Sequence, residues 1–248
     1  MKLFRVEVAA NYAKFSAKWP VELEAIRKEL AKSGAIYESS YSRIVPLGAW
    51  GSSVLEGELS PESLAFFDEA QNDALVSHVF ARLGAWRSAL KSLRSCMENG
   101  LSALYYMDHP VELALWGVGK HRMSFAKLVE YTTSHPRLAE LSSTLTGLDA
   151  IEKEYGTLSR AVHGSAKAFR MTHGATDSQL WTKDPAKLGA WSTRLSEVMR
   201  ILNLLLLAFF RDKISTTQQP GLRKAISLVI PPTKHTEIKK TLGVTLYG

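Results

Sequence analysis

The chain has 248 residues, of which 46% are hydrophobic and 22% are charged, and its formal net charge is +7. This balance is typical of a globular protein that is long enough to bury a core, and it excludes collagen-like, low-complexity and wholly disordered chains. The single cysteine, Cys96, excludes an intramolecular disulfide and cysteine-based zinc or iron–sulfur sites within one chain, and it favours a cytoplasmic location.

The first 59 residues are expected to form an N-terminal segment with one strand and one helix. Lys2–Val8 alternates apolar and polar residues, which predicts a short half-buried strand. Pro20 is expected to begin a helix that ends at Gly34. Tyr37–Gly51 is rich in turn-forming residues and has no clear periodicity.

Residues 60–212 are expected to form a helical bundle. Apolar residues recur there at steps of three and four, and Ser60 with Pro61, like Asp184 with Pro185, is a helix N-terminal pair. The predicted helices are 61–83, 85–107, 111–117, 122–133, 137–145, 148–168 and 185–211. The longest apolar run, Leu204 to Phe210, is far shorter than the roughly 20 residues of a membrane-spanning helix, so we expect no membrane segment.

The last residues, 213–248, are expected to form a basic segment with two short strands, Ala225–Ile230 and Val244–Tyr247. Pairing of these strands with the N-terminal strand predicts a mainly α protein that carries a small β element.

The net charge is unevenly distributed along the chain. The stretch from Ile44 to Ala81 has no Lys or Arg and carries six acids, which leaves +13 on the remainder. The segment from Arg211 to Gly248 has seven basic residues and two acidic ones. Either both are solvated surfaces, or they are separate contact faces for a protein partner and for nucleic acid.

The segment from Tyr155 to Ser165 is the richest in groups that do chemistry. On a helix, Tyr155, Ser159 and His163 share a face, with Arg160 close to it and Arg170 seven residues beyond His163. Such a polar stripe is either a hydrogen-bonded structural network or a catalytic site. In the catalytic interpretation, His163 is the general acid or base and the two arginines hold a phosphate group.

The pattern Tyr-x-x-Leu-Ser-x-x-x-His-Gly from Tyr155, together with the preceding helix and the phrase from Leu104 to Pro110, resembles the HEPN-like proteins of bacterial defence and abortive-infection systems. The resemblance covers residues 60–212 and implies a helical fold, frequent dimerisation and, in many members, metal-independent ribonuclease activity. Those members separate the Arg from the His by four to six residues, whereas here Arg160 and His163 are separated by two.

Arg87 and Arg94 lie along one face of the helix predicted at 85–107, where Arg94 is also positioned to pair with Glu98. This face is either solvated or turned toward the Tyr155–His163 helix, where the two arginines would complete an anion site. The seven histidines are scattered and match no metal-binding spacing, so we expect no metal and no cofactor.

Two functional hypotheses follow from the sequence. In the first, the chain binds or cleaves RNA, with His163, Arg160 and Arg170 catalytic and Tyr155, Ser159, Arg87 and Arg94 binding the substrate. In the second, it is a non-catalytic subunit of a defence or nucleic-acid-processing complex, and His163 is buried and hydrogen-bonded. A protein partner is expected in either case, and a homodimer is one such assembly.

Overall fold

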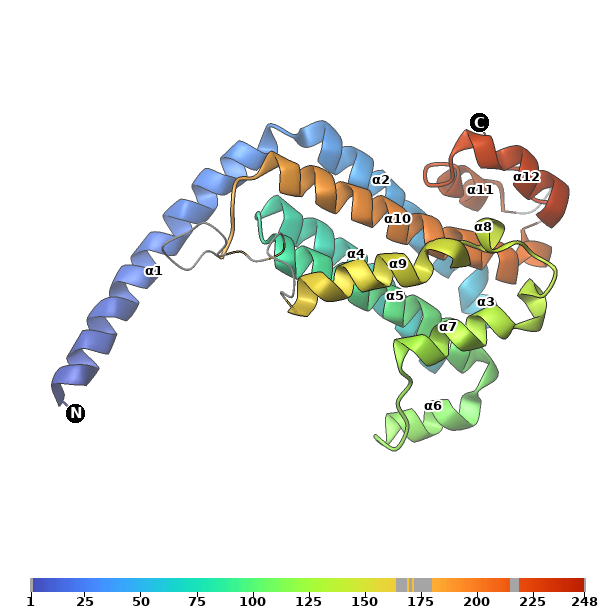
Figure 1. Ribbon diagram of the computed structural model, residues 1–248, viewed down its shortest axis with the longest axis horizontal. Coiled ribbons are helices and arrows are strands. Elements are labelled where there is room, and N and C mark those ends of the chain that lie inside the picture. The colour runs from blue at the N-terminus through green and yellow to red at the C-terminus, as the bar shows by residue number, and fades with distance from the viewer. Residues whose placement is uncertain (1, 164–168, 170, 172–179, 215–218, 248) are drawn as a thin grey trace.

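The computed structural model describes residues 2–163, 169, 171, 180–214 and 219–247 (Figure 1). Its central element is α5 (Trp86–Asp108), which packs along α4 (Pro61–Arg82) across a tight turn at Gly84. Three further helices, α7 (Phe125–Ser134), α9 (Leu148–His163) and α10 (Pro185–Phe209), contact other sides of α5. The mainly α prediction is therefore confirmed.

Two of the long helices, α4 and α10, begin where the sequence places their caps. The Ser60 hydroxyl accepts a hydrogen bond from the Ser63 backbone N–H, and the Asp184 carboxylate accepts hydrogen bonds from the N–H groups of Ala186 and Lys187. These bonds satisfy backbone donors that have no partner within the helix.

The remaining helical elements of this part of the chain pack against these helices or connect them. Their bounds are α2 Gly34–Trp50, η1 Gly51–Leu55, α3 Glu56–Glu58, α6 Pro110–Gly117, η2 Pro136–Leu138, α8 Ser143–Thr146 and η4 Arg211–Lys213. Of these, α2 packs against both α4 and α10, and the buried indole of Trp50 donates a hydrogen bond to Asn203 on α10. The turn-rich stretch Tyr37–Gly51 is thus largely helical, with Pro46 inside α2.

The predicted N-terminal strand is wrong. Lys2–Val8 is the start of α1 (Lys2–Ala31), and Pro20, the expected start of a helix, lies inside it. No Gly or Pro lies between Val8 and Pro20, and this interval is rich in Ala and Lys, so one helix extends through both parts. Figure 1 shows the N-terminal half of α1 projecting away from the bundle.

The predicted C-terminal strands are also wrong, and the described part of the chain has no β element. The expected strand Ala225–Ile230 is the end of α11 (Pro220–Ile226) followed by a turn. The segment Val244–Tyr247 follows α12 (Pro232–Leu242), and its backbone forms hydrogen bonds with side chains of α11 and the turn after it, not with another strand. Arg223 donates a hydrogen bond to the Thr245 carbonyl, and the Ser227 hydroxyl accepts one from the Tyr247 N–H.

Every helix in the described residues is too short or too polar to cross a lipid bilayer. Within the described residues, the acidic stretch contributes one ion pair to the fold, because the Glu58 carboxylate on α3 lies 2.6 Å from the Lys213 ammonium. Part of the charge asymmetry along the chain is therefore neutralised within the molecule.

Candidate functional site

A cavity of about 440 Å³ lies between α5, α9 and α10, and it is the central feature of the candidate site. Its wall combines large apolar side chains with a few polar ones. The lining residues are Trp86, Arg87, Leu90, Thr157, Phe169, Met171, Ala186, Lys187, Ala190, Trp191, Thr193 and Arg194. A mainly apolar hollow with a few polar groups at its edge is the usual form of a ligand-binding site.

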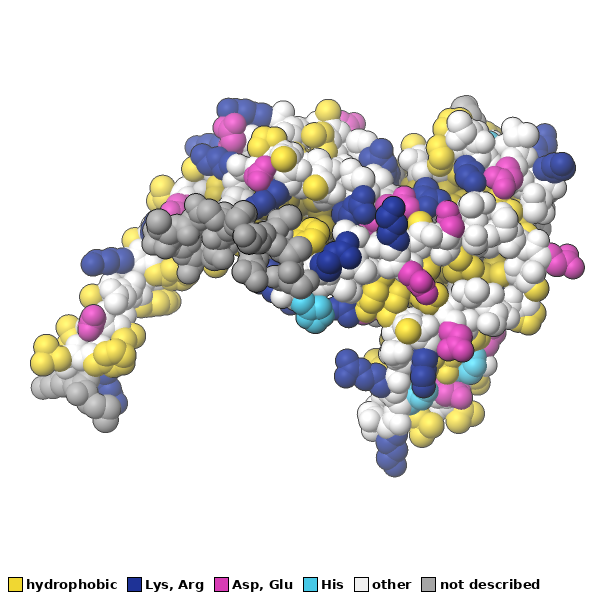
Figure 2. All heavy atoms as spheres, in the orientation of Figure 1, with side chains coloured by type: hydrophobic (Ala, Val, Ile, Leu, Met, Phe, Trp, Pro, Cys, Tyr) yellow, Lys and Arg dark blue, Asp and Glu magenta, His cyan; other side chains and the backbone are white. Residues whose placement is uncertain are grey.

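Three cationic side chains, Arg87, Lys187 and Arg194, line this cavity. The positive charge continues along α9, where Lys153 and Arg160 are exposed and lie on the same face as Thr157, one turn to either side of it. Figure 2 shows Lys and Arg side chains gathered over the middle of the molecule, where α9 and α10 lie. We call Lys153, Arg160, Lys187, Arg87 and Arg194 the basic rim.

Arg87 also caps α9. Its Nε donates a hydrogen bond to the Ala161 carbonyl at 3.2 Å, and its Nη2 donates one to the Val162 carbonyl at 2.5 Å. A guanidinium at the C-terminus of a helix satisfies carbonyls that have no partner within the helix and balances their partial negative charge. Arg87 therefore fixes the end of α9 beside the cavity that it lines.

Arg94 and Tyr155 meet between α5 and α9. The guanidinium of Arg94 donates hydrogen bonds to the Tyr155 hydroxyl at 2.7 Å and to the Glu98 carboxylate at 2.9 Å, and the Tyr155 hydroxyl donates to the same Glu98 oxygen at 2.6 Å. The Tyr155 ring lies parallel to that of Phe125 on α7. Burial, and then the bond to Glu98, raises the pKa of the Tyr155 hydroxyl, which keeps it protonated as a donor.

The remaining predicted site residues are spread along α9. The Ser159 hydroxyl is buried and has no hydrogen-bond partner among the described residues. Arg160 is exposed and donates to the Thr157 hydroxyl at 3.1 Å. His163 ends α9 and is exposed, so the buried His163 that the non-catalytic hypothesis expects is wrong. Arg170 lies outside the described residues.

A buried ion pair that was not predicted from the sequence lies next to the cavity. Glu154 on α9 is buried, and its Oε2 lies 2.5 Å from the Arg194 guanidinium on α10. Its other oxygen, Oε1, has no partner within the described part of the chain. Burial raises the pKa of Glu154 to about 7, nearby Glu197 adds to the effect, and Arg194 opposes it. The overlooked signal is that Glu154 occupies an apolar position of α9, between Ile151 and Leu158.

Replacing Glu154 by glutamine is expected to change how stability depends on pH. The folded-state pKa of Glu154 lies above the ordinary 4.5, so its protonation stabilises the fold at low pH, and this contribution disappears as the pH rises through 7. Between pH 5.5 and 8, the free energy of unfolding of the parent should fall by about 2 kcal/mol relative to that of Glu154→Gln. Urea denaturation at both pH values measures this difference, and parallel pH profiles for the two proteins would contradict it.

A second polar cluster joins the end of α5 to α7. The Asp108 carboxylate accepts hydrogen bonds from the Tyr131 hydroxyl at 2.5 Å and from His135 Nε2 at 2.9 Å, while His135 Nδ1 accepts one from the Arg137 N–H. Both ring nitrogens of His135 are therefore engaged, which is typical of a structural histidine.

In the described residues, no group of three His, Cys, Asp or Glu side chains is arranged to hold a metal ion.

Comparisons with protein-family models, curated proteins and solved structures found no match for the chain. The features of the structure that bear on function are therefore the cavity, its basic rim and the exposed end of α9.

Proposed function

We propose that the chain binds single-stranded RNA at the α5–α9–α10 cavity, with the basic rim holding phosphates. The observation that carries this proposal is the combination of an apolar hollow with three cationic side chains, Arg87, Lys187 and Arg194, in its lining. A nucleotide matches both parts, because its base is a flat, largely apolar ring system and its phosphate is an anion.

The cavity form of the site favours a single strand over a duplex. A base can enter a cavity only when it is unstacked and unpaired, as in single-stranded loops and ends. A volume of about 440 Å³ lies within the usual range for small-ligand pockets and suits one nucleotide. The resemblance to HEPN-like proteins implies that the nucleic acid is RNA. A role in bacterial defence and a cytoplasmic location are further parts of this proposal.

Fluorescence anisotropy with a labelled single-stranded RNA tests the proposal. If three to five cations of the basic rim contact phosphates, the logarithm of the association constant should fall with the logarithm of the salt concentration with a slope of about −2 to −3.5. A duplex RNA of equal length should bind more weakly at the same salt concentration. Equal affinity for the duplex would contradict insertion of a base, and no binding at low salt would contradict the proposal as a whole.

RNA cleavage is a second candidate function, and the exposure of His163 and Arg160 at the end of α9 favours it. An exposed imidazole beside a phosphate-binding surface is within reach of a ribose hydroxyl or a leaving oxygen, where it can act as acid or base. Cleavage without added metal, with loss of cleavage but not of binding in His163→Ala, would support this role. Equal cleavage by parent and variant would contradict it.

A further inference from the structure

The first half of α1 carries a stripe of apolar side chains that the described residues leave largely uncovered. Its members are Phe4, Val8, Tyr12, Phe15 and Trp19, which are 68%, 50%, 70%, 52% and 38% exposed. They are spaced by four, four, three and four residues, so at 100° per residue they fall within about 80° of one another around the helix.

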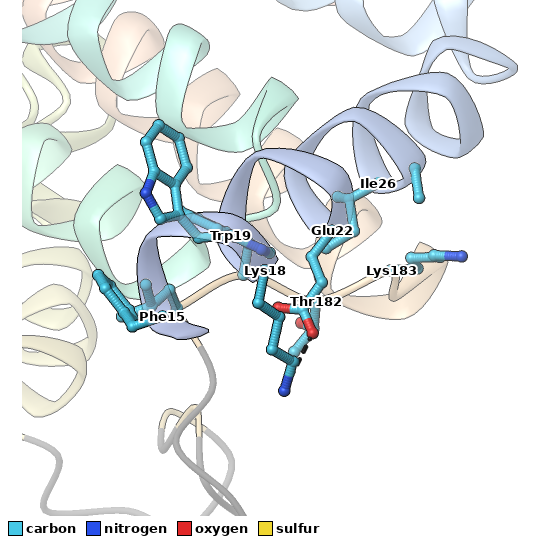
Figure 3. A pocket seen from close by; sticks show the side chains of 10 residues that line it. Phe15, Lys18, Trp19, Glu22, Ile26, Thr182 and Lys183 are labelled. Carbon is cyan, nitrogen blue, oxygen red and sulfur yellow. Dashed lines mark ion pairs between the residues drawn. The ribbon is translucent and has the colours of Figure 1, made fainter. Parts of the chain in front are cut away.

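This stripe continues a face that is buried elsewhere in the same helix. Ile26 and Leu30 lie on the same side of α1 and are buried against the body of the molecule. Between the two parts, the ring centroid of Trp19 lies 6.2 Å from that of Trp181. Both residues line a hollow of about 670 Å³ under α1 (Figure 3). The helix therefore has one apolar face along its whole length, and the N-terminal half of that face extends beyond the bundle.

We propose that a second copy of this chain covers the stripe, with the two α1 helices packed antiparallel. A contiguous exposed patch of four aromatic residues is unusual for a monomer and marks an interaction surface. A helix that projects into water has little stability of its own, so packing of its apolar face is what would hold it.

The exposed area is sufficient for a weak dimer. An aromatic side chain buries about 150–250 Å² when it is covered, so at the exposed fractions above the five residues offer about 500–600 Å² per chain. Two copies together bury at most about 1,000–1,200 Å², which is near the lower limit for a specific interface and corresponds to a weak association.

The arrangement of side chains along the stripe fits antiparallel self-association. With the pair centred near Tyr12, Phe4 lies opposite the partner's Trp19, and Val8 lies opposite the partner's Phe15. Glu7 and Lys18 lie on the same edge of the stripe, so this pairing brings Glu7 of each chain against the partner's Lys18. Lys18 is accessible for this contact, since its side chain is largely exposed and so is its pair with Glu22 at 3.3 Å (Figure 3).

Sedimentation equilibrium of the full chain without RNA tests the inference independently of RNA binding. Over about 1–100 µM, which spans the weak affinity expected for an interface of this size, the parent should show a monomer–dimer equilibrium. The double substitution Phe4→Glu with Phe15→Glu should weaken dimerisation at least about tenfold, because charges within an apolar interface are left without partners.

The same helix offers a matched control on its opposite side. Leu3 and Val21 are 89% and 72% exposed but lie off the stripe, so Leu3→Glu with Val21→Glu should dimerise like the parent. Glu7→Lys and Lys18→Glu should each self-associate more weakly than the parent, whereas their mixture should form a heterodimer. A monomeric parent overturns the inference, also when the stripe binds anionic vesicles instead of a second chain. Equal weakening of dimerisation by the stripe variant and by its control overturns it as well.

Discussion

Reversing three charges of the basic rim is expected to weaken binding of single-stranded RNA by about 10- to 100-fold at low salt. The variant combines Lys153→Glu, Arg160→Glu and Lys187→Glu, and all three side chains extend from helix surfaces. Each substitution removes an attraction to phosphate and adds a repulsion, which over three sites amounts to about 1.4–2.8 kcal/mol. The salt dependence should become shallower in parallel. Fluorescence anisotropy measures both quantities.

The control reverses the same number of charges in the basic C-terminal segment. Lys224, Lys239 and Lys240 are exposed on α11 and α12, and their replacement by glutamate changes the net charge by the same amount. If RNA binds at the cavity, this control should bind within about threefold of the parent, since the remaining effect is long-range and screened by salt. A larger loss in the control than in the rim variant would assign RNA binding to the C-terminal segment.

Replacing Trp191 by alanine is expected to lower the free energy of unfolding by about 3–5 kcal/mol, the range for removing a large aromatic side chain from a core. Trp191 on α10 is fully buried, and its indole N–H donates to the Ser77 hydroxyl, which in turn donates to the Ala89 carbonyl. This chain of hydrogen bonds connects α10 to α4 and α5. The substitution thus leaves a large void where three helices meet.

Two matched variants separate the packing contribution from the hydrogen bond. Trp191→Phe keeps most of the ring and removes the indole N–H, so it should destabilise the fold by about 1–2 kcal/mol. Trp116→Ala removes a half-exposed indole on α6 and should change stability by less than about 1 kcal/mol. Urea denaturation gives all three values. Equal stability of Trp191→Ala and Trp116→Ala would contradict the central role given to Trp191 in the core.

Local signals were sufficient to predict most of the bundle. The helices at Pro61–Arg82 and Trp86–Asp108 follow from their apolar stripes, and the Ser60 and Asp184 caps follow from residue type and position. In each case, neighbours in sequence make the contacts that decide the structure. The Arg94–Glu98 pair is predictable for the same reason, since its members lie one turn apart on α5.

The N-terminal strand shows where this reasoning fails. Phe4, Val6 and Val8 alternate as in a strand, but Phe4 and Val8 are also one turn apart on a helix, so a window of seven residues fits both structures. The longer pattern through Tyr12, Phe15 and Trp19 has helical spacing only and would have decided the question.

The contacts between helices could be identified only from the structure. The sequence placed Tyr155 and Arg94 on separate helices without fixing their rotation, and the hydrogen bond between them depends on how α5 packs against α9. The pairing of Glu154 with Arg194 depends in the same way on the packing of α9 against α10. The cavity and the rim arise from three helices that are distant in sequence, and no local pattern encodes them.

Photo-crosslinking of a 4-thiouridine-labelled single-stranded RNA to the intact protein, followed by mass spectrometry of the linked peptides, tests the central claim most directly. Binding at the cavity predicts crosslinks to peptides that contain residues 86–90, 153–160 and 186–194, and their loss in the Lys153, Arg160 and Lys187 variant. Crosslinks concentrated in residues 220–242, unchanged in that variant, would contradict the proposed site.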